Sequence, residues 1–238
     1  MTAAIDRRLA WDACLNVRDL GGLPAGDQVL RRGVLVRASV IGGLTSLGRD
    51  AMLSHGIRTV IDIRGDDEVA ETPSPFALGV VYRRVPVSSL RMMGLHHAAH
   101  DATLADELRA VAVRGGGLAE SFAAIAEAEP GILLHCTAGR DRTGLVVALL
   151  LAALGVPDDE IVADYVASDD ALAAEYVRFK SLNPDRAAAV DDGIAKRAWV
   201  MDQTLAALRT SFGGATRYLA HAGVPAACLA AIRAKLLA

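Results

Sequence analysis

The sequence contains few aromatic residues and few cysteines. Aromatic side chains make up 4% of its 238 residues, and the three cysteines are Cys14, Cys136 and Cys228. They lie far apart, and no pair has the spacing of a metal site. The sequence therefore predicts neither a disulfide framework nor a zinc centre, and no metal is expected. Unpaired cysteines are typical of a reducing compartment, so we expect a cytoplasmic protein.

Long apolar runs and an excess of charge are also missing. The longest uninterrupted apolar run, residues 145–154, is too short to span a bilayer, and the first fifteen residues lack the apolar core of a signal peptide. We expect no stable membrane insertion, and export without a signal stays open. The net charge of −3 gives no general attraction to nucleic acid, so none is expected as a partner. Nothing in the sequence indicates an oligomeric state.

The order of apolar segments predicts the fold. Apolar residues make up 53% of the chain and charged residues 22%, a globular composition. Short β-branched runs alternate with helical patterns, which predicts an α/β fold: a mostly parallel central sheet flanked by helices, with a helical C-terminal part. Strands are expected within 28–39, 57–64, 80–87 and 132–136, helices over 45–56, 118–130, 144–155 and 157–179, and two or three helices after residue 194.

The segment "HCTAGRDRTG", residues 135–144, joins a predicted strand to a predicted helix. Ligands of α/β sheets bind at the carboxyl ends of the strands. Three small residues there, Thr137, Ala138 and Gly139, let backbone N–H groups point inward and form an anion-binding nest with the helix N-terminus. The planar guanidinium of Arg142 can donate two hydrogen bonds to phosphate oxygens. The plainer alternative is that Arg142 only forms a surface salt bridge.

Cys136 lies at the start of this loop. A buried structural thiol is the plainer interpretation of a free cysteine. A helix N-terminus and a nearby arginine, however, stabilise a thiolate. Below a bound phosphate, that thiolate is placed to attack phosphorus and form a cysteinyl-phosphate intermediate. The sequence therefore favours Cys136 as a nucleophile and gives Cys14 and Cys228 structural roles.

The loop "HCTAGRDRTG" resembles the signature of cysteine-dependent protein tyrosine phosphatases. More narrowly, it is similar to the bacterial tyrosine/dual-specificity group whose loop reads His-Cys-x-x-Gly-Lys-Asp-Arg-Thr-Gly and shares features with lipid phosphatases. "NVRDLGG", "LRRGVLVRAS", "GIRTVIDIRGDDEV", "EIVADYVASDDAL" and "YLAHAG" extend the resemblance over most of the chain. Arg140 departs from the pattern because the family usually has Lys there.

The resemblance implies a single phosphatase domain over residues 1–238 that needs no cofactor. It would hydrolyse phosphotyrosine, with phosphoserine, phosphothreonine and phosphoinositides as further candidate substrates. Arg140, as a second cation at the loop, would favour substrates with several phosphates. Two other classes stay open: a phosphate-recognition module with weak or lost catalysis, and a sulfurtransferase, which also uses a cysteine in an amide-lined loop.

Hydrolysis also needs an acid that protonates the leaving group. The resemblance points to Asp141 inside the loop, and the alternative is that Asp141 only caps the following helix. Asp62 and Asp66, at the end of another predicted strand, are further candidates. Asp101 and Asp106 lie where many tyrosine phosphatases place their acid, but on an ordinary predicted helix.

Supporting roles are expected for several other residues. Thr143 either hydrogen-bonds the cysteine sulfur or bonds its own preceding turn. His135 is expected to hold the loop rather than to act as a base. Arg18, Asp19 and Arg64 are expected to line or buttress the pocket, with a structural ion pair as an equal alternative for each. Asp62 is expected among the substrate-binding residues.

Residues 88–117 match no motif of the family and form a possible lid insertion ending in a glycine run. Three histidines within it, His96, His97 and His100, raise the question of a metal site, but no cysteine lies nearby and Gly94 weakens the helix that would carry them. A polar lid is the favoured interpretation. The predicted helices after Ser168 are a second lid candidate.

Overall fold

The computed structural model describes residues 6–74, 79–87 and 116–238. Its centre is a five-stranded sheet with the order β1-β4-β7-β5-β6. All neighbouring strands run parallel except β1, which is antiparallel to β4. The predicted sheet is therefore confirmed, with β7 in the middle. The strands are β1 (Arg18–Asp19), β4 (Leu35–Ala38), β5 (Thr59–Asp62), β6 (Val81–Arg84) and β7 (Ile132–His135); β2 (Pro24–Ala25) and β3 (Gln28–Val29) form a separate hairpin.

The three inner strands are covered on both faces. Every residue of β4, β5 and β7 is buried, as expected for parallel strands rich in Val, Ile and Leu. Successive side chains of a strand point to opposite faces. In β7, Leu134 packs into the larger apolar core, whereas Leu133 packs into the smaller core with Trp11 and Met52. The sheet is thus held between two apolar layers.

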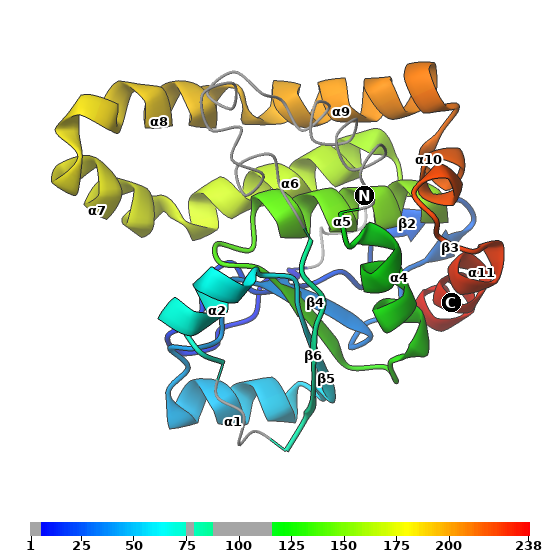
Figure 1. The fold of residues 1–238 in the computed structure, drawn as a ribbon, viewed down its shortest axis with the longest axis horizontal. Coiled ribbons are helices and arrows are strands. Elements are labelled where there is room, and N and C mark those ends of the chain that lie inside the picture. The colour runs from blue at the N-terminus through cyan, green and yellow to red at the C-terminus, as the bar shows by residue number, and fades with distance from the viewer. Residues whose placement is uncertain (1–5, 75–78, 88–115) are drawn as a thin grey trace.

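Helices supply both layers (Figure 1). One face carries α1 and its core residue Met52, and the other carries α4, α5 and the C-terminal helices. The described helices are α1 (Ser46–Ser54), α2 (Asp66–Glu71), α4 (Leu118–Glu127), α5 (Asp141–Leu154), α6 (Asp158–Ala171), α7 (Ala173–Leu182), α8 (Ala187–Ala195), α9 (Arg197–Phe212), α10 (Ala215–His221) and α11 (Ala226–Leu236).

One end of each of two predicted helices is set by the residue that the sequence indicated, Thr45 for α1 and Gly155 for α5. The hydroxyl of Thr45 accepts a hydrogen bond from the N–H of Gly48 and caps α1. Gly155 ends α5 in the left-handed region, with φ of 88°. At its other end, α5 begins at Asp141, a few residues earlier than the apolar pattern indicated. The whole polar sequence after Arg140 therefore belongs to the first turn of a helix.

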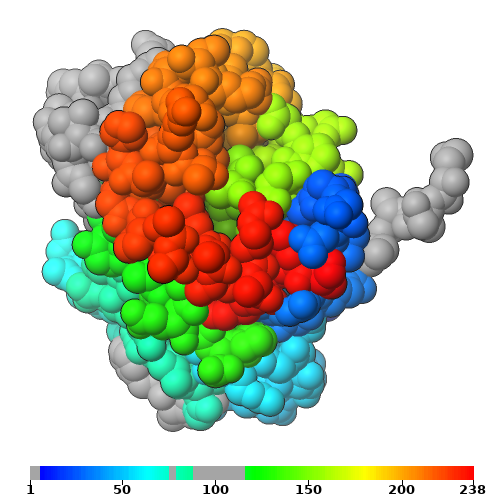
Figure 2. Space-filling model, turned by 90° about the vertical axis from the view of Figure 1, so that its right-hand side faces the viewer, coloured from blue at the N-terminus to red at the C-terminus, as the bar shows by residue number. Residues whose placement is uncertain are grey.

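Four helices follow residue 185, and three of them make up the predicted C-terminal helices. α9 packs along α6, α10 packs on α5, and α11 packs on α4. Figure 2 shows α10 and α11 covering this side of the molecule beside the N-terminal residues. In contrast, α7 and α8 extend away from the sheet in Figure 1, and neither buries a residue.

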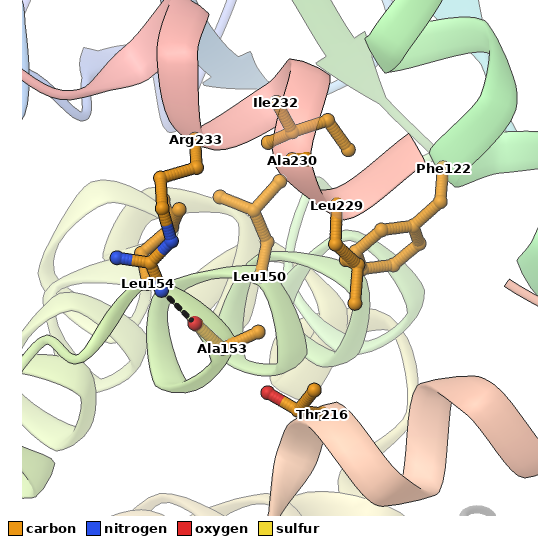
Figure 3. A pocket seen from close by; sticks show the side chains of 9 residues that line it. All are labelled: Phe122, Leu150, Ala153, Leu154, Thr216, Leu229, Ala230, Ile232 and Arg233. Carbon is orange, nitrogen blue, oxygen red and sulfur yellow. Dashed lines mark hydrogen bonds between the residues drawn. The ribbon is translucent and has the colours of Figure 1, made fainter. Parts of the chain in front are cut away.

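A small apolar pocket of about 240 Å³ lies between α4, α5, α10 and α11 (Figure 3). Phe122, Leu150 and Leu229 line it, and the Arg233 guanidinium closes one side by donating to the carbonyl of Ala153 at 2.7 Å. The pocket lies at the carboxyl end of α5, away from the loop that precedes this helix.

The possible lid over residues 88–117 falls almost entirely outside the described residues. The same holds for His96, His97, His100, Asp101 and Asp106. Among the described residues, no helix is long and apolar enough to cross a membrane. The described part of the chain also holds no group of three or more His, Cys, Asp or Glu side chains able to bind a metal ion.

Candidate active site

Cys136 follows the central strand β7 at the carboxyl edge of the sheet. It is 3% exposed and begins a tight loop that ends where α5 starts, at Asp141. Gly139 makes the turn possible because its φ is 67° and a Cβ there would lie 2.1 Å from the carbonyl oxygen of Ala38. The loop thus presses directly against the end of β4.

Three successive carbonyls of the loop are bonded by groups outside it. The carbonyl of Thr137 accepts from the N–H of Val40 at 2.9 Å. The side-chain amide of Asn16 donates to the carbonyls of Ala138 and Gly139, both at 3.1 Å. The Arg37 guanidinium donates to the carbonyl of Gly139 at 2.7 Å.

The opposite sides of these peptide groups carry the N–H donors. The peptide bonds are trans, so each N–H points away from the carbonyl of the same peptide group. The N–H groups of residues 138–140 therefore turn away from those partners, and none of them donates a hydrogen bond within the described residues. Such a row of open donors is what an anion-binding nest requires.

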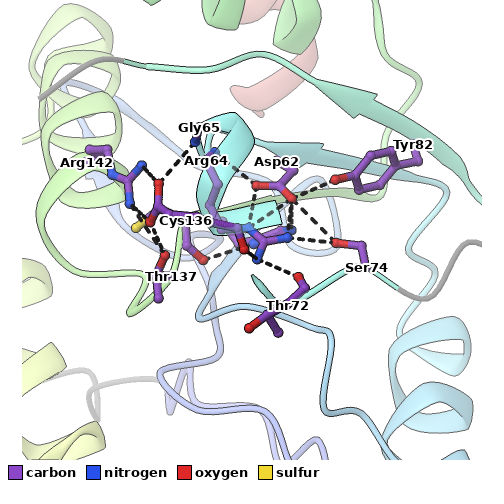
Figure 4. Close-up of polar contacts among 11 residues, drawn as sticks. Asp62, Arg64, Gly65, Thr72, Ser74, Tyr82, Cys136, Thr137 and Arg142 are labelled. Atoms are coloured by element: carbon purple, nitrogen blue, oxygen red, sulfur yellow. Dashed lines mark hydrogen bonds and ion pairs between the residues drawn. The ribbon is translucent and has the colours of Figure 1, made fainter. Parts of the chain in front are cut away.

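Arg142 lies beside Cys136 (Figure 4) and forms a forked ion pair with Glu68. The two terminal nitrogens of Arg142 lie 2.6 and 2.5 Å from the two carboxylate oxygens of Glu68, and the Thr137 hydroxyl also donates to Glu68. Burial alone would raise the pKa of Glu68, but these hydrogen bonds lower it to about 2. Burial likewise opposes the charge of Arg142, but Glu68 and then Cys136 raise its pKa. The thiol therefore lies within the field of this guanidinium.

Asp141 is paired with its neighbour Arg140. The Nε of Arg140 lies 2.9 Å from one carboxylate oxygen and a terminal nitrogen lies 3.0 Å from the other. The Tyr165 hydroxyl donates to the same carboxylate at 3.3 Å. Burial by itself would raise the pKa of Asp141, but Arg140 outweighs it and the pKa is lowered. The side chain of Asp141 is 43% exposed, so a ligand can reach it.

Arg140 also connects the loop to the helices that follow α5. One of its terminal nitrogens donates to the Tyr176 hydroxyl at 2.5 Å, and Tyr176 in turn donates to Asp169 at 2.9 Å. Arg197, at the start of α9, lies 3.2 Å from the same Asp169. The loop is thereby fastened to α6, α7 and α9.

Asp62 and Arg64 form a buried pair one strand away (Figure 4). Arg64 donates to both oxygens of Asp62 at 2.6–3.0 Å and to the carbonyl of Thr72 at 2.9 Å, and Tyr82 donates to Asp62 at 2.7 Å. Burial would raise the pKa of Asp62, but Arg64 lowers it to about 2. Because Arg64 also reaches the carbonyl of Glu68, the pair holds α2, the helix that carries Glu68.

The structure places Arg18 and Asp19 behind the loop. Arg18 is 3% exposed and donates to the carboxylate of Asp164 at 2.9 Å. Asp19 accepts from the N–H groups of Gly21 and Gly33, each at 2.8 Å. For Arg18 and Arg64 the structure thus has the ion pairs that the sequence left open as the alternative to lining the pocket. Asp62, expected to bind substrate, is instead the buried partner of Arg64.

Two further side chains of the segment 135–144, His135 and Thr143, are polar and buried. The Nδ1 of His135 lies 3.0 Å from the carbonyl of Cys136, and burial lowers the pKa of this histidine, which keeps it neutral. The hydroxyl of Thr143 is fully buried and has no hydrogen-bond partner among the described residues. It is therefore available to a group that becomes an acceptor at the loop during a reaction.

Sequence reasoning gave no role to four residues that shape the site: Asn16, Arg37, Glu68 and Asp164. A usable signal existed for Arg37 and Asp164. Each is charged within an otherwise apolar stretch, "VLVRAS" and "IVADYVAS", where a buried charge needs a partner. Nothing in the sequence, however, indicates which residues those partners are.

A thiol at the carboxyl edge of a parallel sheet, a turn of open N–H donors and a guanidinium from the same loop are the groups that a cysteine-dependent phosphatase requires. The comparisons with known proteins agree. The model of the tyrosine phosphatase family matches residues 9–238. A tyrosine-protein phosphatase of Nostoc commune is 33% identical over 210 residues, 79% of this chain and 69% of the relative.

A second relative matches nearly end to end. The triple specificity protein phosphatase PtpB of Mycobacterium tuberculosis is 28% identical over 96% of this chain and 97% of its own. The solved structure of P. aeruginosa TpbA in complex with pTyr has a TM-score of 0.34 at 18% identity, covering 58% of this chain and 71% of that one, which adds nothing to the assignment. The chain belongs to the tyrosine phosphatase family.

Proposed function

We propose that this enzyme hydrolyses phosphotyrosine by way of a phosphate bound in the 136–142 loop. One observation carries the proposal: the carbonyls of residues 137–139 are bonded from behind, which leaves the N–H groups of residues 138–140 open beside Cys136. Arg142 completes the set of donors once its fork turns from Glu68 to the phosphate oxygens. Ala138, Gly139 and Arg140 are thus phosphate-binding residues through their open N–H groups, and we propose the same role for the neighbouring Thr137.

The reaction takes two steps. The thiolate of Cys136 attacks phosphorus, the bond from phosphorus to the phenolic oxygen breaks, and the leaving phenolate takes a proton from an acid. Water then attacks phosphorus, the sulfur–phosphorus bond breaks, and the conjugate base of the acid takes the proton of the water. The buried hydroxyl of Thr143 donates to the sulfur as it leaves with its negative charge.

Asp141 is the best candidate acid among the described carboxylates. Asp62 is fully buried and accepts hydrogen bonds from Arg64 and Tyr82, so no substrate reaches it. Asp66 points outward, with 79% of its side chain exposed, and pairs with Arg84. Asp141 is accessible and adjoins the nest. A bound phosphate dianion next to it opposes the effect of Arg140 and favours the protonated acid.

Hydrolysis of p-nitrophenyl phosphate tests the proposal. Cys136→Ser should abolish turnover but keep phosphate binding, because an alcohol replaces the thiolate while the donors stay in place. Rapid quenching of the wild-type enzyme should trap a phosphate mass on the peptide that contains Cys136. Cys228→Ser is the matched control and should keep the full rate.

The same assay separates the other two classes. A recognition module would bind phosphate without turnover, and a sulfurtransferase would transfer sulfur from thiosulfate instead. Residual activity of Cys136→Ser within tenfold of wild type would remove Cys136 as the nucleophile.

We propose a wider substrate range as well: phosphoserine, phosphothreonine and phosphoinositides. Two observations support it: the second guanidinium, Arg140, adjoins the nest, and one relative is named a triple specificity phosphatase. Arg140→Ala should lower the rate on a phosphoinositide more than the rate on a phosphotyrosine peptide. An equal loss on both, or no lipid turnover by the wild type, would contradict the proposal.

We also propose a cytoplasmic location. The free thiols of Cys14, Cys136 and Cys228 fit a reducing compartment. Fractionation of the native cells, with an antibody to this protein, tests the location directly.

A further inference from the structure

Charged side chains gather behind the phosphate loop, on the side away from the substrate. Asp164, on α6, has a side chain that is 1% exposed. Its carboxylate accepts from Arg37 at 2.6 Å, from Arg18 at 2.9 Å and from Arg7 at 2.8 Å. Three guanidinium groups thus surround one carboxylate, so the cluster carries an excess of buried positive charge.

Two of these arginines continue to the loop. Arg37 uses one terminal nitrogen for Asp164 and the other for the carbonyl of Gly139 at 2.7 Å. Arg18 donates to the side-chain oxygen of Asn16, and this fixes which end of the Asn16 amide faces the loop. The amide nitrogen of Asn16 then donates to the carbonyls of Ala138 and Gly139.

The surrounding structure makes room for this arrangement. Asn16 has a φ of 56°, a left-handed conformation that Asn tolerates and that turns its side chain toward the loop. A Cβ at Gly144 would lie 2.7 Å from the ring of Tyr165 and 3.5 Å from the Arg37 guanidinium. The glycine at the end of "HCTAGRDRTG" is therefore needed for α6 and Arg37 to approach α5.

Such a cluster is a costly way to stabilise a fold. Arg37 is 1% exposed, and well-packed apolar side chains often replace buried ion pairs without loss of stability. Burial, together with the charge of Arg37, lowers the pKa of Arg18 to about 10. The positive charges thus destabilise one another, yet Arg37 donates to the carbonyl of Gly139, and Arg18 holds the Asn16 amide that donates to the carbonyls of Ala138 and Gly139.

We infer that Arg37 and Asn16 are positioning residues of this phosphatase, and that Asp164 is the residue that orients them. By bonding the carbonyls of Ala138 and Gly139 from behind, they aim the N–H groups of residues 139 and 140 at the phosphoryl group. Asp164 holds Arg37 directly and Asn16 through Arg18. The inference rests on the proposed function of the loop as a phosphate site.

A pair of variants isolates this role. Arg37→Gln and Arg7→Gln each remove one guanidinium from Asp164, but only Arg37 also holds the loop. Misaimed oxyanion donors cost roughly 10²–10³ in turnover. We therefore expect Arg37→Gln to lower kcat/KM for p-nitrophenyl phosphate at least tenfold and to weaken competitive inhibition by orthophosphate similarly. Arg7→Gln should change both less than threefold at a comparable loss of thermal stability.

Asn16→Gly keeps the test decisive if Arg37→Gln does not fold. Glycine accepts the left-handed backbone, so this variant removes the amide donor with little strain. It should lower kcat/KM and orthophosphate affinity at least fivefold while the melting temperature stays within a few degrees of wild type. Asp164→Asn, which loses the charge that orients Arg37, should also weaken orthophosphate binding.

Arg37→Lys distinguishes geometry from charge. Lysine keeps the positive charge but cannot reach Asp164 and the Gly139 carbonyl with a rigid fork. We expect it to stay impaired. Full recovery by Arg37→Lys, or equal losses in Arg37→Gln and Arg7→Gln, would overturn the inference. If the wild-type protein does not hydrolyse p-nitrophenyl phosphate, the proposed function itself is wrong.

Discussion

Arg140 and Asp141, neighbours in the chain, form a forked ion pair at the entrance to α5, with nitrogen–oxygen distances of 2.9 and 3.0 Å. The pair lowers the pKa of Asp141, so the free enzyme carries this side chain as a carboxylate at neutral pH. A general acid must be protonated when the leaving group departs. For Asp141 to act as the proposed acid, the negative charge of the bound substrate therefore has to help protonate it, which would link binding to catalysis.

Asp141→Asn tests the assignment of the acid. We expect kcat to fall by about 10²–10⁴, because the leaving group no longer receives a proton. The loss should be larger for phenyl phosphate than for p-nitrophenyl phosphate, whose more acidic leaving group needs less help. Steady-state kinetics on a series of aryl phosphates measures this. A loss that is uniform across the series would mean that Asp141 only shapes the loop.

Arg140→Ala should move the basic limb of the kcat–pH profile to higher pH. Arg140 holds the pKa of Asp141 down, so its removal raises that pKa. An acid stays active only below its pKa, and the enzyme should thus remain active further into the basic range. Arg140→Lys, which keeps the charge, should shift the limb less. If the basic limb of the profile does not move in Arg140→Ala, Asp141 is not the proton donor.

Gly139→Ala should disable the loop without unfolding the protein. A Cβ at this position meets the carbonyl oxygen of Ala38 at 2.1 Å, so the loop must move away from β4. We expect kcat/KM to fall more than a hundredfold. Gly155→Ala is the control, since it has a similar positive φ but open space around the Cβ position. Both should lose about 1–2 kcal/mol from left-handed strain, and only the first should lose activity. Similar activity in the two variants would contradict the account of the loop.

Lys235→Met should reduce stability and leave activity intact. The ammonium group caps the carboxyl end of α4 by donating to the carbonyls of Ile125 and Ala126, both at 2.8 Å, and of Ala128. Loss of these charged hydrogen bonds should cost about 1.5–3 kcal/mol, measured by urea unfolding. Lys196→Met is the control, because its partner Asp192 lies on an exposed helix surface. An equal effect of the two substitutions would argue against the cap.

The sequence alone was enough for the family and for the four longer strands of the sheet, whereas the two-residue strand β1 was not predicted. Buried strands such as residues 132–135 can be recognised in the sequence, because a short run of β-branched residues and leucines between turn residues is typical of a buried strand. Helix ends at Thr45 and Gly155 follow from local hydrogen bonding and backbone freedom. The segment around Cys136 is equally local: the proposed nucleophile, the small residues and the arginine all lie within seven residues. Features of this kind depend only on residues that are close in the chain, so they can be predicted from the sequence.

Only the tertiary structure decided which charged residues meet. Glu68 and Arg142 are far apart in sequence, as are Arg37 and Asp164, yet each pair lies within 2.6 Å. The sequence likewise left open whether Arg64 lines the pocket or forms an ion pair, and it did not indicate Asp62 as the partner. A charged residue within an apolar stretch indicates that it has a partner in the folded protein, because burying an unpaired charge costs too much free energy. The identity of that partner depends on how β1, β4, α2 and α6 converge on the central strand, a property of the folded sheet that no local pattern contains.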